Sequence, residues 1–330
     1  MSNIPFDINS ASDLVDLSIQ KIWIKSGSDL TEYHKKFYNV EAVKDYMVKD
    51  SSLTSISTFS KIPENGNIPA DSPYQGFDKT YTQAYFSGML RITRAMWRYG
   101  ISARKLQDLT NELRKDAIRF KENVLAGPII NMASTSYSDS NGKFSFTVTN
   151  SGGDASAPKA TDHTREDGGS DWANEITDGT TSDMDFDYDA LKAARKVAQA
   201  ILGGVGEKLD VSIDTLLCKK ESSVHHRAQE ILKNIEKGEM PNTANRDSAI
   251  SFPYKIVANP YLTSDTGYAM FDSSMVGSKY GLQLKQGMPL TLDPQFIDYD
   301  NKEMKYSAGM DFAYGFNDFR GWVLSTGLNT

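Results

Sequence analysis

The residues of this chain that could perform chemistry are few, and their spacing completes no catalytic or metal site. His225 and His226 are adjacent in a predicted helix, where neighbouring side chains point about 100° apart. They cannot chelate one metal ion as two histidines on the same helical face would. Cys218 lies in an apolar run that is typical of a buried packing residue. We therefore predict packing or surface roles for all three.

Two further patterns imitate ligand-binding motifs without their context. Gly203-Gly204-Val205-Gly206 follows a predicted helix, whereas a dinucleotide-binding glycine loop follows a strand and opens a helix. The acidic stretch over 153–187 lacks the ligand spacing of a calcium-binding loop. There is no G-x-S-x-G, Walker loop or H-E-x-x-H motif. These absences favour a structural protein over an enzyme, and we predict no catalytic, cofactor-binding or metal-binding residue.

The composition indicates a folded chain with more than one lobe. Its 330 residues are 39% hydrophobic and 24% charged, which allows a substantial core divided between two lobes. A formal charge of −7 argues against a protein that coats nucleic acid. A single cysteine excludes an internal disulfide framework. No apolar run has the length of a signal peptide or membrane span, so we expect no membrane partner.

The elements that position everything else are a long helix and a long strand. Residues 102–127 predict the helix, and Gly127-Pro128 predicts its end. Strict alternation over 304–316 predicts a strand of similar length that packs along this helix. The apolar stripe of the helix, with spacings of three and four, consists of Leu106, Leu109, Leu113, Ala117, Phe120 and Val124.

The remaining segments differ in how well they could fold alone. Residues 1–28 are too short for a domain and are expected to form an arm. Over 50–86, two β-prone runs flank a turn-rich centre, which predicts a long polar hairpin that needs another protein surface. Residues 134–186 are acidic and rich in Gly and Ser, which predicts a surface excursion ordered only where something covers it. Residues 187–279 alternate helix and strand and predict a compact α/β lobe.

This order of elements resembles the major capsid proteins of tailed bacteriophages, which have the Hong Kong 97-type fold. The local similarity lies in three stretches: DSPYQGFDKTYTQAYFSGMLRITRAMWRYG, LDVSIDTLLCKKESSVHHRAQEIL and YSAGMDFAYGFNDFRGWVLSTG. The resemblance implies an α+β fold in five parts. These are an N-terminal arm at 1–28, a peripheral domain at 29–133 and 280–330, an extended loop at 50–86 with a spine helix at 102–127, an insertion at 134–186, and an axial domain at 187–279.

The resemblance also implies a function. It implies self-assembly into hexamers and pentamers of an icosahedral head around packaged double-stranded DNA, in a virion assembled in the host cytoplasm. Scaffold, portal and decoration proteins are the other expected partners. Since some relatives carry a scaffolding segment before the arm and this chain begins near the arm, we expect any scaffold to be separate. The alternatives are an encapsulin-like shell storing a protein cargo, and a soluble α/β enzyme or binding module acting through 187–279.

Two sets of residues are candidates for contacts in such a shell. Nine basic and three acidic side chains lie between Arg91 and Lys121, which indicates either a solvated helix surface or a face turned toward DNA. Some relatives join subunits by Lys–Asn isopeptide bonds, for which Lys61 or Lys79 and Asn317 would be the partners here. The candidate DNA-facing residues are Arg91, Arg94, Arg98, Arg104, Arg114 and Arg119, and the candidate inter-subunit hairpin residues are Lys61, Tyr74, Phe77, Lys79 and Tyr81.

Overall fold

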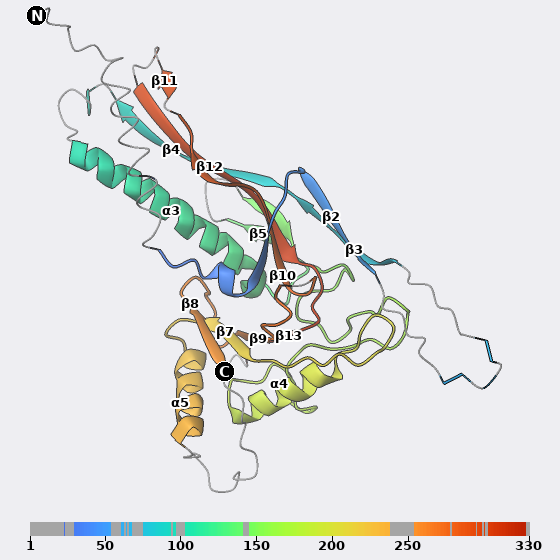
Figure 1. The fold of residues 1–330 in the computed structure, drawn as a ribbon. Coiled ribbons are helices and arrows are strands. Elements are labelled where there is room, and N and C mark those ends of the chain that lie inside the picture. Colours follow the sequence, from blue (N-terminus) through green and yellow to red (C-terminus); the bar gives the residue numbers. More distant parts are fainter. Residues whose placement is uncertain are drawn as a thin grey trace, which may run out of the picture.

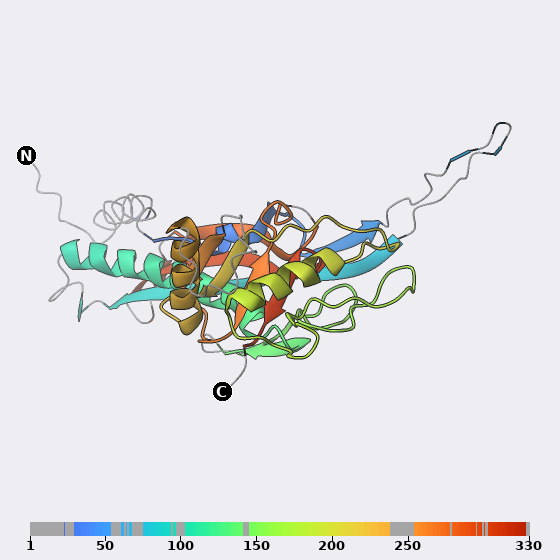
Figure 2. The ribbon, with the colours of Figure 1, turned by 90° about the horizontal axis from the view of Figure 1, so that it is seen from below.

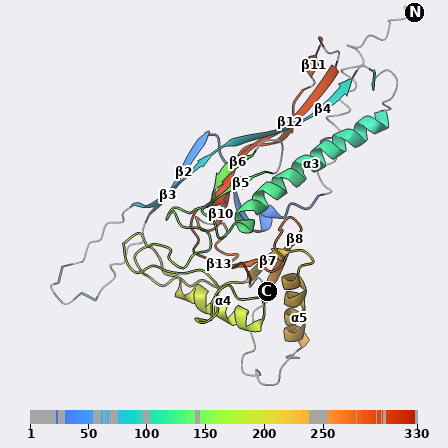
Figure 3. The ribbon, with the colours of Figure 1, turned by 180° about the vertical axis from the view of Figure 1, so that it is seen from behind.

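The computed structural model describes residues 23, 30–53, 61–62, 64, 66–67, 75–93, 95–96, 103–140, 145–237, 254–277, 279–294, 296–298, 300 and 303–327. In this part of the chain, helix α3 (Ala103–Ile130) lies against one face of a five-stranded sheet. A smaller lobe is built around a four-stranded sheet (Figures 1 and 3). The α+β class predicted from the sequence is confirmed.

The five-stranded sheet is centred on β12 (Glu303–Phe316). On one side of β12 lie β11 (Phe296–Asp298) and β10 (Leu282–Leu292), with β1 (Tyr38–Ala42) parallel to β10, and on the other side lies β4 (Ala84–Thr93). The predicted alternation is confirmed, because every second residue from Met304 to Phe316 is buried. One face of the strand is therefore committed to the core.

Helix α3 supplies the other half of that core. Its 28 residues extend for roughly 42 Å, and it contacts both β4 and β12. Phe120 packs on Phe86 of β4 with ring centroids 5.5 Å apart, and Phe86 stacks on Phe312 at 4.6 Å. Val124 is fully buried, whereas Leu109 near the start of the predicted stripe is 36% exposed. The second half of α3 is thus the part that anchors it.

The predicted helix end at Gly127-Pro128 is wrong, because α3 continues to Ile130. Gly127 serves close packing instead: a Cβ at this position would lie 2.4 Å from the Tyr137 hydroxyl oxygen. The helix closes where the Asn131 backbone N–H donates to the Gly127 carbonyl oxygen at 3.0 Å. The Asn150 side-chain amide donates to the Pro128 carbonyl oxygen at 3.2 Å. The adjacent Asn131 backbone and the distant Asn150 side chain therefore satisfy carbonyl groups that a glycine cap would have served.

Strands β2 (Met47–Leu53) and β3 (Gln75–Thr82) form an antiparallel pair that projects from the body, at the opposite end of the molecule from the start of α3 (Figures 1 and 2). The sequence predicted that one hairpin continued to Phe86. In the structure β3 ends at Thr82, and residues from Ala84 onward pair with β12 in the long sheet. Most of the predicted hairpin tip, 54–60 and 68–74, lies outside the described residues, as does most of the predicted arm.

The smaller lobe has the predicted helix-strand-helix-strand order of α4 (Tyr188–Ala200), β7 (Thr215–Lys219), α5 (Ser223–Lys237) and β8 (Lys255–Asn259). Its sheet has the order β13-β9-β7-β8, where β9 is Tyr268–Phe271 and β13 is Trp322–Ser325. We expected residues 280–330 to belong with α3. Strand β13 departs from that division, because its four apolar or small residues are all buried against the smaller lobe.

Residues 134–186 were predicted to be ordered only where something covers them, and over the described residues the chain itself provides that cover. Strands β5 (Ser136–Asp139) and β6 (Phe146–Thr149) form a hairpin, and the long connection that follows packs on the chain itself. Trp172, Ile176, Met184 and Phe186 belong to the same buried cluster as the sheet residues. A few widely spaced apolar residues therefore order a segment whose composition is otherwise that of a loop.

Candidate assembly surface

The root of the β2–β3 hairpin is held by the body of its own chain. Lys79 is buried, and its Nζ donates to the backbone oxygens of Thr149, at 3.3 Å, and Ser151. Burial lowers the pKa of Lys79 to about 8, although Asp154 nearby acts in the opposite direction. Tyr81 is only 2% exposed. Both side chains are buried within their own chain, and a contact of Lys79 or Tyr81 with a neighbouring subunit stays a prediction.

Lys285 fixes the hairpin root from the other side. Its Nζ lies 2.6 Å from Glu41 Oε2 and 2.7 Å from Asp50 Oδ2, and so joins β10 to β1 and β2. Burial alone would lower the pKa of Lys285, but the two carboxylates raise it above its usual value. Nothing in the local sequence marks Lys285, because its partners are far away along the chain. The hairpin therefore leaves the body in a fixed direction.

The other predicted hairpin residues are placed differently. Phe77 lies against Gly153, where an added Cβ would be 2.6 Å from Phe77 Cβ. Lys61 is exposed, and Tyr74 lies outside the described residues. The Asn317 side-chain amide donates to the Lys279 carbonyl oxygen at 3.0 Å. Cross-linking through Lys61 stays a prediction, whereas the Lys79 amine is already bound to backbone oxygens.

Large apolar side chains remain exposed on the face of the long sheet that points away from α3. Along β4, Phe86 and Ile92 face the helix, whereas Tyr85 and Met89 point to the opposite face and are 58% and 61% exposed. Phe296 of β11 is 64% exposed. Tyr46 and Met47 add 69% and 59% exposed side chains at the start of β2. Such a concentration on one chain marks a surface for interaction with another.

Among the predicted DNA-facing arginines that the structure describes, Arg91 lies on β4, whereas Arg114 and Arg119 lie on α3. Arg114 lies over the ring of Trp23, 5.3 Å from its centroid, and burial lowers the pKa of Arg114 although Glu32 acts to raise it. Arg119 is partly exposed and pairs with Asp116 at 2.9 Å. Arg91 is exposed on the sheet, 3.6 Å from Glu303. Arg94 and Arg98, and the side chain of Arg104, lie outside the described residues.

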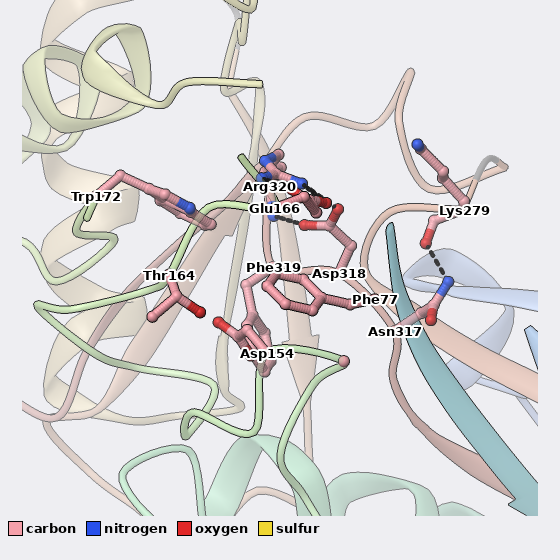
Figure 4. Close-up of a pocket in the computed structure, with 11 residues that line it drawn as sticks. Phe77, Asp154, Thr164, Glu166, Trp172, Lys279, Asn317, Asp318, Phe319 and Arg320 are labelled. Atoms are coloured by element: carbon pink, nitrogen blue, oxygen red, sulfur yellow. Dashed lines mark hydrogen bonds and ion pairs between the residues drawn. The ribbon is translucent and has the colours of Figure 1, made fainter. Parts of the chain in front are cut away.

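A small pocket lies where the hairpin root, the 150–186 segment and the closing strands meet (Figure 4). Arg320 lies at its wall, 2.7 Å from both Glu166 Oε2 and Asp318 Oδ2. Burial raises the pKa of Asp318, although Arg320 opposes this. Burial alone would lower the pKa of Arg320, but Asp318 and Glu166 raise it. The paired charges fasten Glu166 to the connection between β12 and β13, so this pocket is better explained as a structural junction than as a catalytic centre.

The side chains of His225 and Cys218, for which the sequence predicted packing or surface roles, lie against other groups of their own chain. The His225 Nδ1 accepts the Glu221 backbone N–H at 3.3 Å, and its Nε2 lies 3.2 Å from the Gln229 side-chain nitrogen. The ligand atoms of Glu221, His225 and His226 lie within 4.8 Å of one another, and both His225 ring nitrogens already lie within hydrogen-bonding distance of a neighbour. Burial raises the pKa of Cys218 to about 12, which leaves its thiol unreactive.

The glycine loop after α4 is filled by its own chain. The Glu207 side chain accepts the Val205 backbone N–H at 3.0 Å, in the position that an anionic ligand would take. A Cβ at Gly203 would lie 2.1 Å from Glu207. The described part of the loop is therefore closed by an internal carboxylate.

Among the described residues, no helix is both long enough and apolar enough to cross a membrane.

Comparison with known proteins connects this geometry to a family. The family model described as phage capsid protein matches residues 77–325. A solved structure from Gordonia phage Cozz is 13% identical, with a TM-score of 0.52, over 89% of this chain and 85% of that one. One from Mycobacterium phage Bobi is 13% identical, with a TM-score of 0.50, over 92% and 93% of the two chains. No curated protein sequence matches. The long helix on the long sheet, the projecting hairpin and the match over 77–325 together lead to one conclusion: the chain belongs to the phage capsid protein family.

Proposed function

We propose that this chain is the major capsid protein that assembles into hexamers and pentamers of an icosahedral head enclosing double-stranded DNA. The observation that carries the proposal is the row of exposed apolar side chains on the open sheet face, above all Tyr85, Met89 and Phe296. In a capsid family member, such side chains find their cover on neighbouring copies. Scaffold, portal and decoration proteins would act with it, and assembly would take place in the host cytoplasm.

Contact with DNA would be electrostatic and independent of sequence. Phosphate contacts need only positive charge, which Arg91 and Arg119 can supply from exposed positions. Arg119 is partly neutralised by Asp116 and Glu112, so its contribution should be modest at physiological salt. Arg114 is a weaker candidate, since Trp23 covers its guanidinium.

Negative-stain electron microscopy of the chain expressed alone, or with its scaffold if one is required, tests assembly. We expect uniform shells or six-fold rings. Deleting residues 62–74 leaves both hairpin strands intact, and should give a folded subunit that forms no closed shell. Normal shells from this deletion would remove the hairpin from the assembly mechanism, and compact single particles under all conditions would contradict the proposed function.

The contents of the particles distinguish a phage head from a storage compartment. Nuclease-resistant double-stranded DNA in particles from infected cells supports the phage head, whereas an enclosed enzyme without nucleic acid would indicate an encapsulin-like shell. Reversing both Arg91 and Arg119 to Glu should lower DNA retention while shells still form. The charge-matched control is the double reversal of Lys192 and Arg227 in the smaller lobe, and equal retention by both variants would argue against DNA contact at 91 and 119.

A further inference from the structure

In the part of the chain that the structure describes, no strand pairs with the edge of β4 that lies opposite β12. Its ten residues pair with β12 in continuous register, from Ala84 opposite Phe312 to Thr93 opposite Glu303. Among the described residues, β12 is the strand that hydrogen-bonds to β4. Helix α3 contacts the face of the sheet, and β4 runs along the border of the molecule, cyan at the left of Figure 2. The second edge of β4 therefore presents backbone N–H and C=O groups outward.

This edge lacks the features that normally prevent strands from pairing between molecules. Proteins protect exposed edges with proline, bulges, charges or short strands. Strand β4 has no proline and no register shift, whereas β10 contains Pro289 and its pairing with β12 shifts twice. Arg91 is the single charged residue in β4, and Ser87, Gly88 and Met89 at its centre are all exposed. The edge is thus regular, long and accessible in the isolated chain.

We propose that β4 pairs antiparallel with β4 of a second copy, about a two-fold axis at Met89, so that two five-stranded sheets become one. The inference rests on the self-assembly proposed above and names one contact within it. A two-fold axis perpendicular to the sheet keeps both α3 helices on the same face. Facing residues then come from the same face of each strand, with Met89 opposite Met89 of the partner subunit and Ser87 opposite Arg91 of the partner subunit.

Charge and exposure favour this arrangement. In the antiparallel pairing the two copies of Arg91 lie at opposite ends of the contact, roughly 13 Å apart, since each residue of a strand rises about 3.3 Å. A parallel pairing in register would place them side by side. Centring the axis on Met89 brings two exposed apolar side chains together. Centring it on Gly88 would instead leave each Met89 facing a serine hydroxyl.

Cysteine cross-linking in assembled particles tests the contact. In Met89→Cys, the two Cα atoms would be about 4.5–5.5 Å apart, which is within the range of a disulfide. The native Cys218 is buried and does not compete. After mild oxidation, we expect a dimer on a non-reducing gel and a peptide linking residue 89 to residue 89. Ser87→Cys, on the same face of the same strand, is the control, because its two copies would lie roughly 13 Å apart and stay monomeric.

Each result decides between the arrangements. Shells of Met89→Cys without the dimer would overturn the pairing, and so would equal cross-linking of Ser87→Cys. In a double variant that carries Ser87→Cys and Met89→Cys, a disulfide between position 87 of one copy and position 89 of the other would place the axis at Gly88. If neither single variant cross-linked, that result would overturn the proposed register. Failure of the wild-type chain to assemble under any condition would count against the proposed function itself and remove the basis of this contact.

Discussion

At the scale of single residues, three buried cations hold distant segments of the described chain together by different means. Lys285 and Arg320 each meet two carboxylates, whereas Lys79 meets two backbone oxygens. Carboxylates offset the cost of removing a charge from water far better than neutral carbonyl groups do. This difference explains why the pKa of Lys79 falls and the pKa of Lys285 rises.

The lowered pKa of Lys79, about 8 against 10.5 in the unfolded chain, gives a pH dependence with a definite sign. Between these values the unfolded chain binds more protons, so the free energy of unfolding rises with pH. Lys79→Met should remove this rise, which at 1.4 kcal/mol per pKa unit amounts to about 3 kcal/mol over the whole interval and to about 2 kcal/mol between pH 7.5 and pH 9.5. Denaturant unfolding of both chains at pH 7.5 and pH 9.5 measures it. Parallel pH profiles would show that the Lys79 charge is not the cause.

Breaking the Arg320 cluster should be costly. Glu166→Gln removes one partner and leaves the buried guanidinium with Asp318 alone, so we expect a loss of roughly 3–5 kcal/mol in the free energy of unfolding. Glu112→Gln is the matched control, because Glu112 pairs with Lys115 and Arg119 at an exposed site and should cost less than about 1 kcal/mol. Urea denaturation of the two variants gives the comparison, and equal losses would contradict this account of the cluster.

At the scale of elements, aromatic side chains between α3 and the long sheet stabilise the contact between the two. Phe86 stacks on Phe312 and touches Phe120 and Phe146. Phe86→Ala should therefore cost roughly 3–5 kcal/mol, as large-to-small changes in a core do. Met89→Ala, three residues along the same strand but on the exposed face, should change stability by less than about 0.5 kcal/mol. Thermal unfolding of the unassembled subunit separates the two, and similar melting temperatures would place the core elsewhere.

The sequence predicted those elements whose signal is local and periodic. The alternation from Met304 to Phe316 and the helix-strand-helix-strand order after Asp187 both appear as expected. The failures have long-range causes. Gly127-Pro128 does not end the helix because Asn131 and Asn150 bind its carbonyl groups, and Gly127 makes room for Tyr137. The 150–186 segment is held through Glu166 by Arg320, in the connection between β12 and β13, and no local pattern records this contact.

The candidate surface could be predicted only in part. The hairpin predicted from the sequence ended at Phe86, and no strand was predicted for 87–93, so the sequence did not show that Tyr85 and Met89 face away from a helix. The excess of basic residues in 91–121 did not indicate which way their side chains point. In the structure, the ring of Trp23 covers Arg114. Composition records the residue types, whereas exposure depends on which partner each strand finds.

At the scale of the whole molecule, the described part of the chain has an elongated outline rather than that of a compact globule (Figures 1 and 2). The β2–β3 hairpin projects from the rest of the described chain (Figure 2). We expect small-angle X-ray scattering of the unassembled subunit to give a radius of gyration clearly above the roughly 20 Å of a compact 330-residue protein. A value near 20 Å would mean that the hairpin folds back onto the body in solution.

The position of β13 in the smaller lobe has a consequence for biosynthesis. Strand β9 pairs with β13 at Trp322–Ser325, and β1 and β4 pair with β10 and β12. Neither sheet can close before residues 303–325 have left the ribosome. Pairing over such sequence separations is slow, and it leaves both sheets of the nascent polypeptide incomplete until then. Subunits would thus become competent to join a shell only after residues 303–325 have emerged, which keeps unfinished chains out of growing particles.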